Sequence, residues 1–297
     1  MVNRKAKIFF IINPHSGNNK KVDIPSKILS TLNRQIFEPE FIQTETIKEL
    51  SNILEDIKQD NNIIIAVGGD GTINYIINKI IDSDITFGII PRGSGNGLAR
   101  DLCIPRTING AIAVINQLHC RKIDVMQIGN RYSVNVSGIG FDAIIADKFS
   151  KLKQRGFKNY FRITKREIKN IKPQKYQILI DGKHYDTNVY LISFANSKQW
   201  GNNAFVAPDA KIDDGLIDVV MLYPFPVFSL PLLLTGLFTK TINRSKYLNT
   251  IKAKKVVVKK TGDIFAHIDG EPQVFKDELT VSIYPRQLRI LSPPHSI

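Results

Sequence analysis

The segment IIIAVGGDGT, residues 63–72, is followed directly by INYIINKII, residues 73–81. Its first five residues are apolar and mostly β-branched, which favours a strand that is buried on both faces. Beyond the glycine-rich turn, apolar residues recur at helical spacing, namely Ile73, Ile76, Ile77, Ile80 and Ile81. The segment therefore predicts a buried strand, a tight turn and a helix, in that order.

The same order of strand, turn and helix occurs twice more in the first 105 residues. KIFFII (7–12) precedes NPHSG (13–17) and an amphipathic segment near residues 24–33. TFGIIP (86–91) precedes RGSGNG (92–97) and LARDL (98–102), and FEPEFIQT (37–44) predicts a further strand. This alternation is typical of an α/β domain with a parallel sheet that helices cover on both faces.

From about residue 124 the pattern changes to alternating strands with hairpin turns. Gly129–Asn130 and Asp181–Gly182 are tight-turn sequences. Strands are predicted at LIDVVML (216–222), KKVVVKK (254–260), DIFAHI (263–268) and LTVSIY (279–284). This half is typical of an antiparallel β sandwich or barrel. We place the first domain at residues 1–122 and the second at 123–285, and the strand in 286–297 can return to the first domain.

Length and composition agree with two folded domains. The chain has 297 residues, of which 43% are hydrophobic and 23% charged, and one hydrophobic core rarely serves a chain of this size. Cys103 and Cys120 form neither a disulfide framework nor a zinc-binding set, so free thiols are expected. The run at Tyr223–Phe238 is too short to span a bilayer and carries three prolines. A buried helix entered through Pro-rich turns is favoured over the alternative, a lipid-facing element.

The net charge of +14 predicts attraction to an anionic partner. A helical basic insert is expected at residues 144–172, and each Lys or Arg near an anionic membrane surface contributes roughly 1 kcal/mol of attraction. No zinc-finger or RRM-type signature accompanies the charge, so a nucleic-acid partner is not expected. The insert contains Lys148, Lys151, Lys153, Arg155, Lys158, Arg162, Lys165, Arg166, Lys169 and Lys172.

The glycine-rich turns all follow strands of the predicted parallel sheet, where α/β proteins bind ligands. Glycine lets the backbone approach a phosphate, and a helix N-terminus offers free N–H groups to it. Neither a GxxxxGK[ST] loop nor a GxGxxG fingerprint is present. Asp70 lies within such a loop, and two interpretations are open: a ligand of Mg²⁺ that bridges to phosphate, or the N-cap of the following helix.

These motifs together resemble the diacylglycerol kinase catalytic family. NPHSG, GGDGT, PRGSGNGLAR (91–100), DDGLIDV (213–219) and IDGE (268–271) occur in the family's order, and GSGNGLA is similar to the sphingosine kinase form. GGDGT is shared with NAD kinases and resembles a phosphofructokinase loop. The resemblance implies an α/β N-terminal domain of the phosphofructokinase and NAD kinase type, with an all-β antiparallel sandwich as the C-terminal domain. It also implies transfer of the γ-phosphate of ATP, with Mg²⁺, to a hydroxyl of diacylglycerol or a related membrane lipid.

The resemblance also implies roles for individual residues. Glu271 would be the general base, and Asp70, Asp124 and Asp269 would belong to the same catalytic network, with Asp70 and Asp124 holding Mg²⁺. Asp269 and Glu271 flank a glycine, so an extended chain there would place both carboxylates on one face. A structural metal ion would be bound at Lys211, Asp214 and Leu216. ATP would be contacted by Asn13, Pro14, His15, Ser16, Gly17, Thr44, Gly68, Gly69, Asp70, Gly71, Thr72, Asn74, Gly93, Ser94, Gly95 and Asn96.

Two positions depart from the family pattern. Tyr75 stands where relatives often have Glu, and Gly97 stands where many bacterial relatives have Asp. The alternatives are a sphingoid-base kinase, an NAD kinase-like enzyme with a small water-soluble substrate, and a non-catalytic sensor of lipid or nucleotide. We expect a cytoplasmic protein that is peripherally associated with the inner face of an anionic membrane, and the sequence leaves a homodimer open.

Overall fold

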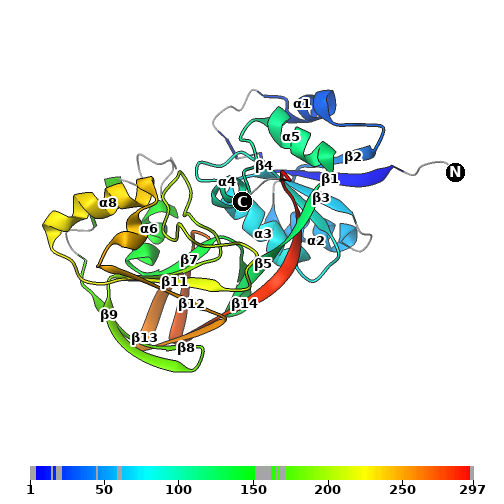
Figure 1. The fold of residues 1–297 in the computed structure, drawn as a ribbon. Helices are drawn as coiled ribbons and strands as arrows, with labels where there is room; N and C mark the ends of the chain where they lie inside the picture. Colours follow the sequence, from blue (N-terminus) through cyan, green and yellow to red (C-terminus); the bar gives the residue numbers. More distant parts are fainter. Residues whose placement is uncertain are drawn as a thin grey trace. The chain divides into compact units, whose positions relative to one another are not determined.

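The computed structural model describes residues 5–14, 16–17, 22–44, 46–58, 62–150, 162–164, 166–167 and 171–294. The chain divides into two compact units (Figure 1). The first comprises residues 1–123 and 286–297, and the second comprises residues 124–285. Strand β14 (Glu271–Leu291) starts in the second unit and ends in the first.

The first unit contains a parallel sheet with strands in the order β2-β1-β3-β4, as the sequence predicts. The last part of β14 adds a parallel strand beside β4, where Arg289 lies opposite Thr86. The central strand β3 is buried along its whole length, as its apolar sequence requires. The strands are β1 (Ala6–Ile12), β2 (Phe37–Ile42), β3 (Ile63–Gly68) and β4 (Thr86–Pro91).

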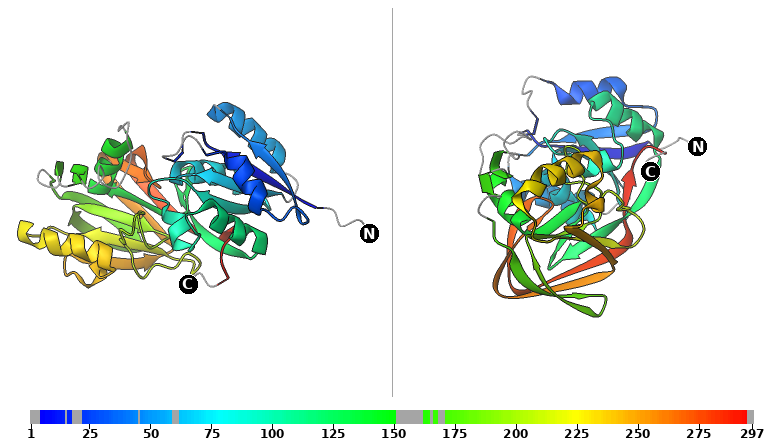
Figure 2. Two further views of the ribbon diagram at one scale, coloured as in Figure 1. Left: turned by 90° about the horizontal axis from the view of Figure 1, so that it is seen from above. Right: turned by 60° about the vertical axis from the view of Figure 1, so that its left-hand side comes forward.

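Helices cover both faces of this sheet. Helices α1 and α5 pack together on one face, whereas α2 and α3 pack together on the other (Figure 1, Figure 2). Asp23, Thr46 and Thr107 accept backbone N–H groups as the N-caps of α1, α2 and α5. The helices are α1 (Ile24–Thr31), α2 (Ile47–Ile57), α3 (Asp70–Ile80), α4 (Gly97–Asp101) and α5 (Ile108–Gln117).

The strand pairs within the second unit are antiparallel, so the predicted fold class is confirmed for both halves. The predicted hairpin turns are confirmed as well, because Ile128 pairs with Arg131 and Ile180 pairs with Lys183. Besides β14, the strands are β5 (Cys120–Ile128), β6 (Arg131–Ser133), β7 (Val136–Gly140), β8 (Gln174–Ile180), β9 (Lys183–Val189), β10 (Leu191–Ala195), β11 (Ile217–Leu222), β12 (Leu248–Ala253) and β13 (Lys255–Ile268).

Three helical elements accompany the second unit's strands downstream of β11, in addition to helix α6 (Phe141–Ser150) after β7. They are the 3₁₀ helix η1 (Val227–Ser229), the helix α8 (Leu230–Thr239) and the 3₁₀ helix η2 (Ile242–Arg244). Among the described residues, no helix combines the length and the apolar character needed to cross a bilayer.

Two predictions about elements need correction. The runs KKVVVKK and DIFAHI form one strand, β13, whose pairing with β14 shifts register between Lys259 and Asp263. Within Tyr223–Phe238, a helix (α8) follows a Pro-rich entry as predicted, but it is not a buried helix, because Leu232 is 74% exposed. From the predicted basic insert, Lys151, Lys153, Arg155, Lys158, Lys165 and Lys169 lie outside the described residues.

Candidate functional site

The three predicted glycine-rich loops of the first unit (NPHSG, GGDGT and RGSGNG, in chain order) and the predicted contact residue Thr44 follow the carboxyl ends of adjacent parallel strands. Asn13 follows β1, Thr44 lies just beyond β2, Gly69 follows β3 and Gly93 lies just beyond β4. The register of the sheet keeps these ends level, because Val67 pairs with both Ile12 and Ile90. The loops therefore lie along one edge of the sheet, the place at which α/β folds bind ligands.

The second and third loops touch through their backbones. A Cβ atom built on Gly93 would lie 2.6 Å from the Cα atom of Gly69, and one on Gly69 would lie 2.9 Å from the Cα atom of Gly93. No residue other than glycine fits at this contact without displacing the backbone. The two glycines therefore hold the GGDGT loop against the GSGNG loop, in which the Gly93 N–H donates to the Oδ1 of Asn96.

Asp70 joins these two loops. Its carboxylate oxygens accept hydrogen bonds of 2.8 Å from the backbone N–H groups of Asn96 and Gly97, at the start of α4. The N-cap of its own helix α3 is Gly69, so the interpretation of Asp70 as that N-cap is wrong. Mg²⁺ prefers oxygen ligands such as carboxylates, so the residue fits a Mg²⁺ ligand chemically.

The first loop is bound to the second and third. The Asn13 amide donates to the hydroxyl of Thr72 at 2.8 Å, and Ser16 bonds back to the Asn13 carbonyl. Sequence reasoning missed Arg92, whose Nη2 donates to the Ser16 carbonyl at 3.4 Å and whose guanidinium lies against Gly17. The sequence signal that could have identified Arg92 is its position directly after β4, immediately before the glycine-rich loop. Arg92 brings a cation to the loops that are predicted to receive phosphate.

The remaining predicted nucleotide contacts differ in exposure. Ser94 is exposed in the third loop, and Asn74 is buried within α3, where its Oδ1 accepts a bond from Asn78. Tyr75, one of the departures from the family pattern, donates its hydroxyl to the carbonyl of Ile47 at the start of α2, so it ties two helices together. Among the predicted residues, His15 lies outside the described part of the chain.

The second unit joins Asp124 and Asp269 through one buried network. Asn196 donates to the carbonyls of Asp124 and Val134, and the N–H of Val134 donates to the carboxylate of Asp269 at 3.1 Å. Asp124 is fully buried and accepts a 2.6 Å bond from Gly215 N–H. Asn196 thus ties the main chain of Asp124 to the segment that binds the Asp269 carboxylate.

Asp269 lies in the tight turn that joins β13 to β14. Its φ of 48° and the φ of 88° at Gly270 identify a type I′ turn, so the chain is not extended there. The expectation that an extended chain places Asp269 and Glu271 on one face is therefore wrong. Asp269 accepts bonds from Ser133 and from backbone N–H groups of the Val134–Asn135 segment, whereas Glu271 is the first residue of β14. Among the described residues, the Glu271 carboxylate has no hydrogen-bond or ion-pair partner.

The predicted structural metal site lies in the loop before β11. Asp214 accepts a bond from the N–H of Leu216 and forms an ion pair with Lys252 at 2.8 Å, while Lys211 is exposed. The described residues contain no group of three His, Cys, Asp or Glu side chains arranged to hold a metal ion. Mg²⁺ needs only one or two carboxylates when phosphate oxygens complete its shell, so Asp70 and Asp124 remain suitable as single ligands.

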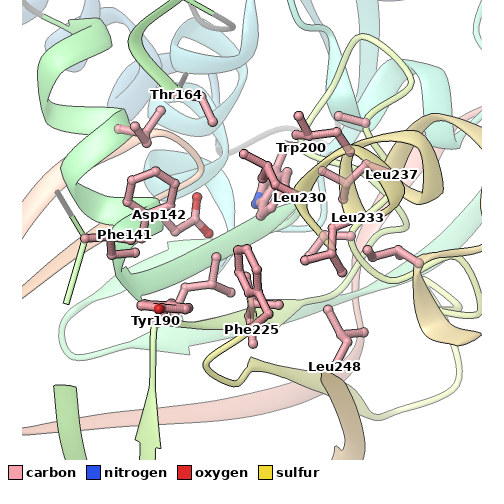
Figure 3. Close-up of a pocket in the computed structure, with 18 of the residues that line it drawn as sticks. Phe141, Asp142, Thr164, Tyr190, Trp200, Phe225, Leu230, Leu233, Leu237 and Leu248 are labelled. Carbon is pink, nitrogen blue, oxygen red and sulfur yellow. The ribbon is translucent and has the colours of Figure 1, made fainter. Parts of the chain in front are cut away.

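An apolar pocket lies within the second unit (Figure 3). Leu230, Leu233 and Leu237 of α8 line one side of it. Phe141 of α6 and Tyr190 line the other side, and the pocket encloses about 980 Å³ of non-protein space, its open mouth included. Further lining residues are Asp142, Ile145, Thr164, Ile171, Leu191, Trp200, Ala204, Val206, Leu222, Phe225, Leu234, Phe238, Ile242 and Leu248. An almost wholly apolar lining suits a hydrocarbon chain.

One carboxylate stands in this pocket wall. Asp142 accepts a 2.9 Å bond from the Ser193 hydroxyl, and its Oδ2 lies 3.0 Å from Nε2 of the buried His267. Burial acts to lower the pKa of His267. The Asp142 carboxylate, with a smaller contribution from Asp269, outweighs burial and raises the pKa. Sequence reasoning missed this pair, because a lone His in a strand is usually a packed core residue.

Comparison with known proteins adds evidence from outside this chain. The diacylglycerol kinase catalytic domain model matches residues 7–128, and the model of the YegS C-terminal NAD kinase beta sandwich-like domain matches residues 135–292. The diacylglycerol kinase of Bacillus subtilis (strain 168) is 28% identical over 298 residues, which cover 98% of this chain and 97% of that protein.

Two solved structures share the fold. A diacylglycerol kinase from Bacillus anthracis str. Sterne has a TM-score of 0.74 at 19% identity, with 98% of each chain covered. An NAD kinase from Archaeoglobus fulgidus, solved in complex with ATP, has a TM-score of 0.56 at 12% identity, with 97% of this chain and 95% of that chain covered. These two structures show the fold, and the two matching domain models show that the chain belongs to the diacylglycerol kinase catalytic domain family, with a YegS-like C-terminal domain.

Proposed function

We propose that this chain is an ATP-dependent lipid kinase that transfers the γ-phosphate of ATP to a hydroxyl of diacylglycerol or a related membrane lipid. The observation that carries the proposal is the apolar pocket of the second unit. An apolar lining gains free energy from a buried hydrocarbon chain and gains little from a dinucleotide, whose groups are mostly polar. The relatives named above as diacylglycerol kinases support the same substrate class.

Phosphoryl transfer requires an oriented hydroxyl, neutralised phosphate charge and a group that accepts the hydroxyl proton. In the proposed reaction, Glu271 takes that proton as the lipid oxygen bonds to the γ-phosphorus. The bond from the γ-phosphorus to the bridging oxygen breaks, and ADP leaves. Asp70 and Asp124 would hold Mg²⁺, which when bound would neutralise phosphate charge, and the glycine-rich loops with Arg92 would bind the phosphates.

The NAD kinase likeness is the reason to test a second substrate class. The purified chain should be tested with labelled ATP and Mg²⁺ in three separate reactions, which contain diacylglycerol micelles, sphingosine micelles or NAD as the acceptor. We expect label in phosphatidic acid. Label in NAD alone would overturn the proposal, and label in sphingosine alone would move it to sphingoid bases.

Glu271→Gln tests the catalytic role and separates an enzyme from a sensor. We expect its kcat to fall by roughly 10²–10⁴, because the base is lost while the shape is kept. Glu278→Gln is the matched control: it lies in the same strand but is exposed and paired with Lys259, so it should keep wild-type activity. Equal activity of both variants would refute the role of Glu271.

A further inference from the structure

The outward face of η1 and α8 is apolar and unusually exposed. Val227 and Phe228 are each 83% exposed and Leu232 is 74% exposed, whereas Leu233 on the opposite face is buried. Phe228 and Leu232 are four residues apart, so they lie on the same side of the helical stretch. We call Val227, Phe228 and Leu232 the apolar ridge. The inward leucines of α8 line the apolar pocket (Figure 3), so one short helix separates that pocket from the apolar ridge.

The composition of this element is unlike that of a solvated helix. From residue 219 to residue 239 the sequence contains no Asp, Glu, Lys or Arg. The exposed Thr235 and Thr239 donate their hydroxyls back to the carbonyls of Pro231 and Thr235, at 2.9 and 3.0 Å. Their polar groups are therefore satisfied within the helix, which is the condition that a nonaqueous surrounding imposes.

The charge that follows the apolar ridge is uniformly positive. No acidic residue occurs between residues 219 and 262, and the first three cations after α8 are exposed. Lys240, Arg244 and Lys246 have no carboxylate partner among the residues that the structure describes. An apolar face followed by unneutralised cations complements a bilayer whose headgroups are anionic.

We propose that the apolar ridge inserts into an anionic phospholipid bilayer, with Lys240, Arg244 and Lys246 at the headgroups. The inference rests on the proposed function, in which a lipid substrate must pass from the bilayer into the apolar pocket behind α8. It places membrane docking on α8, a different element from the basic insert at residues 144–172.

The test measures sedimentation with vesicles of phosphatidylcholine and phosphatidylglycerol, and with vesicles of phosphatidylcholine alone. Phe228→Gln/Leu232→Gln should weaken binding to the mixed vesicles roughly tenfold or more, because two large side chains no longer enter hydrocarbon. Lys240→Gln/Arg244→Gln/Lys246→Gln should weaken binding to the mixed vesicles but leave binding to the phosphatidylcholine vesicles unchanged. The control Ile47→Gln changes a residue that is 70% exposed in the first unit and should bind as wild type does.

Activity distinguishes docking from catalysis. The ridge variant should lose activity on diacylglycerol in vesicles but keep wild-type activity on a short-chain, monomerically dispersed diacylglycerol. If the wild type phosphorylates no lipid yet binds vesicles through the ridge, docking stands and the proposed function fails. If the ridge variant binds vesicles normally, the inference is overturned, and a simultaneous change from dimer to monomer in light scattering would assign the ridge to a second copy of this chain.

Discussion

Arg92 places a guanidinium against Gly17, between the first and third glycine-rich loops. Guanidinium groups bind phosphate by paired, charge-assisted hydrogen bonds. Arg92→Ala should therefore weaken ATP binding roughly tenfold, which corresponds to about 1.4 kcal/mol. Isothermal titration with ATP measures the effect. Arg106→Ala changes an exposed arginine of the same unit and should leave the affinity unchanged; an equal loss in both variants would show a general charge effect.

The His267–Asp142 pair predicts a pH dependence of stability. Because Asp142 raises the pKa of His267, the folded protein binds a proton more tightly than the unfolded chain does. The stabilisation is fully present below the unfolded pKa of about 6.5 and is lost as pH rises through the folded pKa. Urea unfolding at a series of pH values should show this decline in the wild type.

Asp142→Asn removes the charge that raises the pKa, so the decline above about pH 6.5 should disappear from its unfolding curves. Ser193→Ala is the control, because it removes a hydrogen bond to Asp142 but leaves the carboxylate. An unchanged pH profile in Asp142→Asn would contradict the assignment.

The sequence predicts the glycine-rich loops because each begins directly after an apolar strand. It does not reveal the partners of Asp70, since its hydrogen bonds reach residues 26 and 27 positions away in another loop. The same holds for Asp142 and His267, which come from different elements; His267 directly precedes the IDGE motif, but that motif does not indicate Asp142 as its partner. Contacts between distant loops depend on how the strands align, and a single sequence does not state that alignment.

The β13–β14 turn depends on the carboxylate of Asp269. Asp269→Ala removes an acceptor used by Ser133 and the Val134–Asn135 backbone, so it leaves donors of buried residues unpaired. We expect the free energy of unfolding to fall by about 2–4 kcal/mol and activity to fall with it. Asp181→Ala is the matched change in the turn between β8 and β9, where the side chain is exposed, and should cost about 1 kcal/mol. Chemical denaturation compares the two, and equal losses would argue against a special role for Asp269.

Elements are predictable where one periodicity dominates. The three strand-loop-helix units have long apolar runs, and α1, α3 and α4 lie where the sequence predicts their helices. The burial of helix α8 was harder to predict, because leucines on both of its faces are compatible with a fully buried helix and with a helix that has one exposed side. Its Pro-rich entry through η1 turns Val227 and Phe228 outward, and only three-dimensional packing reveals this.

The first unit takes its last strand from the far end of the sequence. Ile290 is fully buried and pairs with Phe87 of β4, whereas Arg289 beside it is only half-buried. Ile290→Ala should lower the free energy of unfolding by about 2–5 kcal/mol and weaken ATP binding, although it lies outside every glycine-rich loop. Arg289→Ala should change stability by no more than about 0.5 kcal/mol. Thermal unfolding with and without ATP measures the stability and the ATP binding of both variants. Wild-type stability and ATP binding in Ile290→Ala would show that β14 is dispensable to this unit.

That late strand has a consequence for how the chain is made. A ribosome releases β1 to β4 early, but the partner of β4 emerges only after all of residues 124–285. Until then, the edge of β4 presents unpaired N–H and C=O groups that could pair with a stray strand. The second unit, encoded as one uninterrupted stretch, can fold on the nascent polypeptide, so the unit that starts first is completed last.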